Sequence, residues 1–105
     1  YPHSLHSIPS NADNQDVVSM GADAALFAAC TAANTALVVA IELAALSQAF
    51  AITKGERRAS PQGRGLIGAI RNRVKTVAED RPLWRDMQNL AGAVRRGEVC
   101  EPLFD

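Results

Sequence analysis

The sequence predicts an all-α protein, in which one long central helix of a multi-subunit helical bundle is followed by two shorter C-terminal helices. Alanine takes the place of aromatic residues, which make up only 5% of the 105 residues, and alanine is the strongest helix former. No proline interrupts the chain between Pro9 and Pro61, and no alternating strand pattern appears. The apolar fraction of 48% excludes a disordered chain.

Residues 1–15 are expected to form a loop. Pro2 and Pro9 disfavour helical conformation in the residues before them, and a polar cluster, SNADNQD (10–16), follows. A long helix is then predicted over residues 16–53, starting near Asp16 and ending about Ile52, with Gly55 as a stop. At 1.5 Å per residue this helix would be about 55 Å long.

The long helix is predicted to be buried on most sides. Large apolar side chains occur around its whole circumference, so it needs neighbours on every face, from other chains or from absent parts of the same chain. A membrane span is disfavoured because polar residues are spread along residues 24–52 and no aromatic belt marks either end. Glu42 is the one charge there, and a basic partner outside the segment explains it better than a proton-transfer role.

Residues 54–105 are predicted to form a helical hairpin and a tail. Ser60 can cap a helix that starts at Pro61 and runs to about Ala78. Pro82 starts a third helix, and Gly97 is expected to end it. The last residues, EVCEPLFD (98–105), are expected to be a short tail.

Charge and cysteine content narrow the class of protein. All eleven Lys and Arg lie from Lys54 onward, but seven acids accompany them and few aromatics could stack on bases, so nucleic-acid binding is not expected.

Cys30 and Cys100 do not make a disulfide framework, which favours a reduced, cytoplasmic protein. His3 and His6 lack further ligands, so no metal site is expected. The start Tyr1-Pro2-His3 suggests a piece of a longer chain.

The polar cluster before the long helix has more amides than a cap requires. Asp13 and Asp16 can accept hydrogen bonds from the first backbone N–H groups of the helix and can complement its dipole. Asn11, Asn14 and Gln15 are then not needed for capping. Neutral amides at the positive end of a helix suit a substrate carboxylate. The residues alone leave both interpretations open, a helix cap and a ligand site.

The stretch HSIPSNADNQDVVSMG (6–21) closely resembles the C-terminal motif of aromatic amino acid ammonia-lyases and their sister aminomutases. ASPQGRGLIGAIR (59–71) and EDRPLWRDMQNLAGAVRRGE (79–98) look like the last two helices of that family. The resemblance covers nearly the whole chain but only the C-terminal end of a family member. It implies an all-helical homotetramer whose active sites combine several subunits and carry methylidene-imidazolone (MIO), a prosthetic group built from an internal Ala-Ser-Gly.

By this resemblance, Gln15 would be the catalytic residue, hydrogen-bonding near the prosthetic group, and Asn14 would bind the substrate carboxylate. Asn11 would lie at the edge of the pocket, and Asp16 would cap the helix. Histidine-specific members typically have Glu in place of Gln15, followed by Asp-His, so the Gln-Asp-Val found here favours phenylalanine or tyrosine.

The expected activity is therefore elimination of ammonia to give trans-cinnamate or p-coumarate. No Ala-Ser-Gly occurs in the 105 residues, so this segment alone should be inactive and needs the rest of the enzyme. Two alternatives stay open: an MIO-dependent aromatic 2,3-aminomutase, which shares the motif, and a non-catalytic helical assembly subunit. The segment distinguishes neither phenylalanine from tyrosine nor lyase from aminomutase.

Overall fold

The structure, a computed structural model, describes residues 1, 5, 7–9, 12, 14 and 18–101. It contains the helices α1 (Gly21–Ile52), α2 (Pro61–Arg71) and α3 (Trp84–Arg95), and the short 3-10 helix η2 (Gly55–Arg58). No strand occurs among these described residues, and the predicted all-α class is confirmed. The chain divides into two compact units, Tyr1–Ala33 and Asn34–Asp105, each of which is described by itself.

Helix α1 begins at Gly21, later in the chain than predicted from the polar cluster. Val18, Ser19 and Met20 precede the helix. Met20 has a φ of 48°, in the left-handed region, which a right-handed helix cannot include. The carbonyl of Met20 nevertheless accepts the Ala24 N–H at 3.0 Å, so the helical hydrogen bonds start directly after this turn.

The end of α1 matches the prediction, although its details differ. Ile52 is the last helical residue, and Lys54, not Gly55, takes the left-handed conformation with a φ of 53°. Gly55 is needed for a different reason. A Cβ atom added there would lie 2.8 Å from the ring of Phe50, so the backbone passes too close to this ring for a side chain.

Within this chain α1 buries little of its surface. Its buried residues are Ala36, Ala40 and Ser47. The helix is long and apolar enough to cross a membrane by length and composition, with a mean hydropathy of 2.0, but a helix buried inside a soluble assembly meets the same criteria. Burial by other chains therefore stays a prediction.

Helix α2 starts as predicted and ends earlier. The Ser60 hydroxyl accepts the Gly63 N–H at 3.1 Å, and Pro61 occupies the first helical position. The helix stops at Arg71 instead of near Ala78. The chain beyond it contains Val74, Thr76 and Val77, whose branched side chains disfavour helix, and Val77 has hydrogen-bond partners on α1.

Helix α3 begins at Trp84, after Leu83, rather than at Pro82. Its end follows the prediction closely: Gly97 has a φ of 79°, and its N–H donates to the Val94 carbonyl. The Glu98 N–H donates to the Ala93 carbonyl, which completes a Schellman motif.

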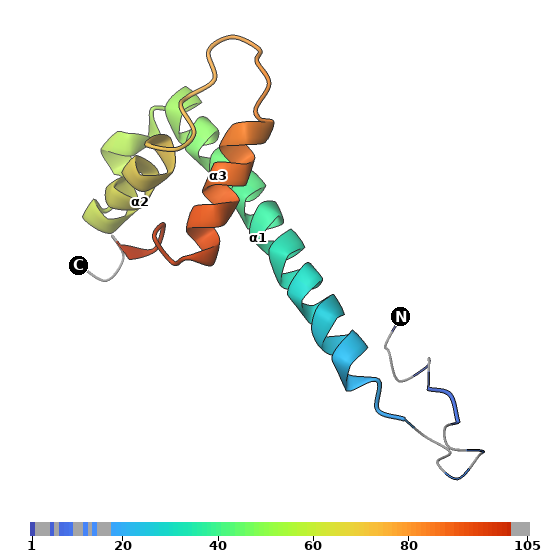
Figure 1. The fold of residues 1–105 in the computed structure, drawn as a ribbon. Coiled ribbons are helices and arrows are strands. Elements are labelled where there is room, and N and C mark those ends of the chain that lie inside the picture. The colour runs from blue at the N-terminus through green and yellow to red at the C-terminus, as the bar shows by residue number, and fades with distance from the viewer. Residues whose placement is uncertain (2–4, 6, 10–11, 13, 15–17, 102–105) are drawn as a thin grey trace. The chain divides into compact units, whose positions relative to one another are not determined.

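The core lies in the unit Asn34–Asp105, where α2 and α3 pack beside the C-terminal part of α1 (Figure 1). Ala40 and Leu90 are completely buried in it. Val99 is only 1% exposed, so the predicted tail in fact includes a core residue. The core cluster consists of Ala40, Ile70, Val74, Leu90, Ala91, Ala93 and Val99.

Candidate functional site

The candidate site is the segment that precedes α1. Of the three residues expected to act there, Asn14 lies within the described residues, exposed in a turn. An exposed amide can both donate and accept hydrogen bonds with a ligand. Asn11, Gln15 and the predicted cap Asp16 lie outside the described residues, so their roles stay predictions.

Described residues on either side of Asn14 are joined by a hydrogen bond. The Ser7 hydroxyl accepts the Val18 N–H at 2.7 Å, and both residues are half-buried. Two non-glycine residues of this segment adopt left-handed backbone conformations, Ala12 with a φ of 52° and Met20 with 48°. Such conformations are unfavourable for L-residues and are often found at functional sites.

The electrostatics of this segment favour an anionic group. The first turn of a helix exposes N–H groups without helical partners, and the aligned peptide dipoles place a partial positive charge there. In α1 this turn contains one acid, Asp23, which is half-buried. No group of three or more metal-ligating side chains exists among the described residues; His3 and His6 lie outside them.

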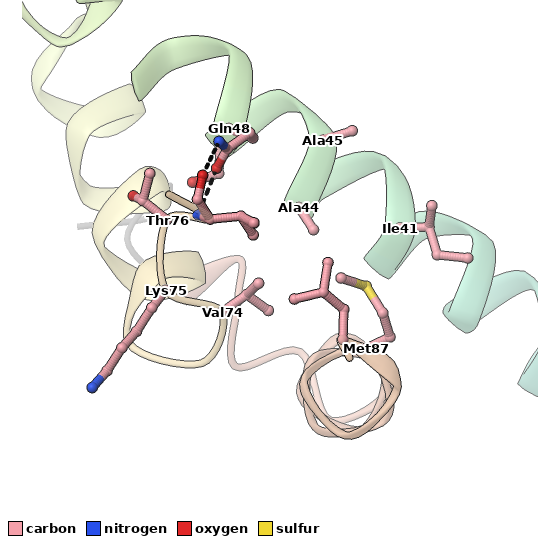
Figure 2. A pocket seen from close by; sticks show the side chains of 11 residues that line it. Ile41, Ala44, Ala45, Gln48, Val74, Lys75, Thr76 and Met87 are labelled. Carbon is pink, nitrogen blue, oxygen red and sulfur yellow. Dashed lines mark hydrogen bonds between the residues drawn. The ribbon is translucent and has the colours of Figure 1, made fainter. Parts of the chain in front are cut away.

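A separate cavity of about 220 Å³ lies in the unit Asn34–Asp105, between α1, the chain after α2, and α3 (Figure 2). It is smaller than most ligand pockets and mainly apolar. The ammonium group of Lys75 points away from it in Figure 2. The cavity therefore has no arrangement of acids, bases or nucleophiles. It is lined by Ile41, Ala44, Ala45, Ser47, Gln48, Val74, Lys75, Thr76, Val77, Leu83 and Met87.

Gln48 uses its amide to hold the chain beside this cavity. Its Nε2 donates to the Val77 carbonyl at 2.8 Å, and its Oε1 accepts the Val77 N–H at 3.0 Å (Figure 2). These two bonds satisfy a backbone group that neither α2 nor α3 includes. Gln48 therefore has a structural role and is not free to bind a ligand.

Glu98 joins the ends of two helices. Its carboxylate pairs with Arg96 and, at 2.8 Å, with Arg73. Hydrogen bonds from Arg96 and then from Arg73 lower the pKa of Glu98 to about 2, and the same contact raises the pKa of Arg96. This cluster stabilises the turn after α3.

No pattern in the sequence pointed to Ser7, Gln48 or Glu98. The contacts of Ser7 and Gln48 connect residues far apart in the chain, so no local pattern marks them. The exposed Glu42 and the exposed, free Cys30 and Cys100 were noted, and nothing in the structure gives them a chemical role.

Comparison with known proteins agrees with the resemblance of the motif. Residues 1–72 match the family model described as aromatic amino acid lyase. The chain is 38% identical over 100 residues to the tyrosine ammonia-lyase of Cupriavidus metallidurans, which covers 95% of this chain and 19% of that protein. It is 42% identical over 99 residues to the histidine ammonia-lyase of Symbiobacterium thermophilum, which covers 94% of this chain and 19% of that protein.

A solved structure has the same fold as this chain. The crystal structure of tyrosine aminomutase from Streptomyces globisporus superimposes with a TM-score of 0.91 at 37% identity, over 98% of this chain and 20% of that one. The chain thus spans about one fifth of the length of the relatives it matches. Because the family model matches more than half of the residues and the helices coincide with those of a solved relative, the chain belongs to the aromatic amino acid lyase family.

Proposed function

We propose that the complete enzyme eliminates ammonia from phenylalanine or tyrosine and releases trans-cinnamate or p-coumarate. The observation that carries this proposal is the order Asn14-Gln15-Asp16-Val17 before α1, in a chain of the aromatic amino acid lyase family. A neutral amide at Gln15 suits an uncharged ring, whereas a carboxylate would suit an imidazole better. Relatives named for tyrosine and for histidine are similarly identical to this chain, so these residues, and not overall similarity, guide the choice.

In the elimination, a base takes the β-proton, the electrons of that C–H bond form the new double bond, and the amino group leaves as ammonia. Methylidene-imidazolone, formed by an Ala-Ser-Gly outside this segment, would supply the electrophile. The described residues are compatible with such a neighbour, because the exposed amide of Asn14 neither titrates nor acts as a nucleophile.

The roles proposed for this chain are binding and orientation. Asn14 would donate hydrogen bonds to the substrate carboxylate, beside the positive end of α1. Gln15 would be the catalytic residue, with an amide that both donates and accepts hydrogen bonds next to the reacting atoms. Asn11 would contact the edge of the substrate.

We also propose that the complete enzyme is a cytoplasmic homotetramer. Leu26 and Leu46 on α1 are 66% and 58% exposed in this chain, and apolar surface of this extent on a soluble protein normally meets a partner. Free thiols at Cys30 and Cys100 suit a reducing compartment.

Replacing Gln15 by Ala in the complete enzyme tests the proposed site. Loss of one positioned amide should lower kcat by roughly 100-fold. Gln62→Ala, at an exposed glutamine in the first turn of α2, is a matched control that should leave kcat unchanged. Turnover unaffected by Gln15→Ala would show instead that the polar cluster is only a helix cap, as expected for a non-catalytic assembly subunit.

A second candidate function is an aromatic 2,3-aminomutase, favoured by the structural match to tyrosine aminomutase at a TM-score of 0.91. This enzyme would return the ammonia to the β-carbon. Incubation of the complete enzyme with phenylalanine, tyrosine and histidine, followed by chromatography, separates the possibilities. An aryl acrylate as main product supports the lyase, a β-amino acid supports the aminomutase, and turnover of histidine alone contradicts the assignment from Gln15.

A further inference from the structure

One hydroxyl group connects the two sides of the candidate active-site segment. The Ser7 hydroxyl accepts the Val18 N–H at 2.7 Å across eleven positions of the chain. The stretch between them contains Asn11, Asn14 and Gln15, the residues proposed to meet the substrate. Both Ser7 and Val18 are half-buried, so water competes less for this hydrogen bond than at an exposed site.

Val18 lies where the segment joins the helix, so its hydrogen bond to Ser7 affects the start of α1. It lies just before Gly21, the first residue of α1, and neither α1 nor any other helix uses its N–H. The Ser7 hydroxyl therefore attaches the early part of the segment to the backbone that leads into the helix. Two residues with left-handed backbone conformations are close to this contact in the sequence: Ala12 lies between Ser7 and Val18, and Met20 follows Val18. Such conformations persist only where surrounding contacts hold them.

We propose that Ser7 is a positioning residue for the ammonia-lyase site, which holds the turn at Asn14 in its active conformation through the hydrogen bond to Val18. This inference rests on the proposed function. A side chain held loosely samples geometries in which its amide misses the substrate, and small displacements of this kind reduce catalysis strongly. Ser7 itself need not touch the substrate.

The test uses Ser7→Ala in the complete enzyme. Without the hydroxyl, kcat/KM should fall about tenfold, equivalent to about 1.4 kcal/mol. Ser7→Thr keeps a hydroxyl and should recover most of this loss. If the alanine variant does not assemble, Ser7→Cys preserves the shape of the side chain while sulfur accepts only weakly, and it should show the same loss.

Ser60→Ala is the matched control. Ser60 also accepts a backbone N–H through its hydroxyl, from Gly63 at 3.1 Å, but it caps α2, in the unit Asn34–Asp105. This variant should have a lower thermal midpoint and an unchanged kcat/KM. An equal loss of kcat/KM in Ser60→Ala would mean that general destabilisation explains the effect, and would overturn the positioning role.

A double-mutant cycle with Asn14→Ala separates positioning of the site from general structural support. If Ser7 acts by holding Asn14, Ser7→Ala should cause little further loss in an enzyme that already lacks the Asn14 amide. Losses that multiply would overturn the inference. Normal activity in Ser7→Ala together with strong loss in Gln15→Ala would overturn the inference alone, whereas normal activity in Gln15→Ala would overturn the proposed function itself.

Discussion

The two units of the chain differ in how much of their structure they support by themselves. In Asn34–Asp105, nine apolar residues are buried among those that the structure describes, and three helices share one core. In Tyr1–Ala33, no described residue is buried, and Leu5, Ile8 and Leu26 are all more than half exposed. The unit with the packed core has no catalytic arrangement among its described residues, and the described residues of the unit with the candidate site form no core of their own.

This difference suggests that the two units have different roles in the enzyme, one structural and one in the candidate site. A packed unit holds its shape through its own apolar contacts, so its geometry is fixed before assembly. A segment without a core depends on partners for its geometry, and the candidate site in the first unit would then be completed only when the enzyme assembles.

The largest effect is expected from Leu90→Ala, which removes a fully buried side chain from the core of the second unit. Truncation of such a leucine typically costs about 3 kcal/mol, because a cavity remains. Hydrogen exchange of the complete enzyme should show lower protection throughout α2 and α3. Unchanged protection would show that this unit does not depend on its own core.

A smaller effect is expected from Leu26→Ala in the first unit. Leu26 is 66% exposed in this chain, so within the chain alone the truncation should change stability little. If subunits cover α1, each subunit should instead lose about 2 kcal/mol of association energy.

Sedimentation of the complete enzyme in increasing urea measures this association. If the enzyme is the proposed tetramer, the Leu26→Ala variant should dissociate at a lower urea concentration than the unchanged enzyme. Equal dissociation would mean that Leu26 faces solvent in the assembly. The low burial of the first unit would then be a property of the protein surface and not a sign of missing subunit contacts.

The sequence predicted what is encoded locally. Ser60-Pro61 and Gly97 mark helix ends through contacts within one turn, and the structure has both. The all-α class followed from composition and from the absence of proline between Pro9 and Pro61, which are also local properties. The identification of the polar segment depended on resemblance and not on any spacing of residues.

The errors of the sequence analysis arose where distant contacts decide the structure. Val74 continues the apolar spacing of α2 and is buried in the core, but it lies after the helix, so periodicity overestimated the length of α2. Val99 appeared to belong to a tail because its packing partners lie far away in the sequence. The Ser7–Val18 hydrogen bond, which joins residues eleven positions apart, leaves no local pattern either.

The smallest effect is expected from Glu98→Gln, at the turn where α3 ends. Glu98 has its pKa lowered to about 2 by Arg96 and Arg73, so its charged form stabilises the folded state. This contribution is fully present above the ordinary glutamate pKa of about 4.3 and disappears as the pH falls toward 2. Both the carboxylate and Arg96 are partly exposed, so the effect should be small.

Thermal unfolding of the complete enzyme and of Glu98→Gln at several pH values measures this contribution. At pH 7 the variant should unfold at a slightly lower temperature, and the gap should narrow as the pH falls below about 4. A gap that stays constant over this range would assign the effect to lost packing or hydrogen bonds and not to charge. The charge of Glu98 would then contribute nothing to the stability of the second unit. The stability of that unit would instead depend on the apolar core around Leu90.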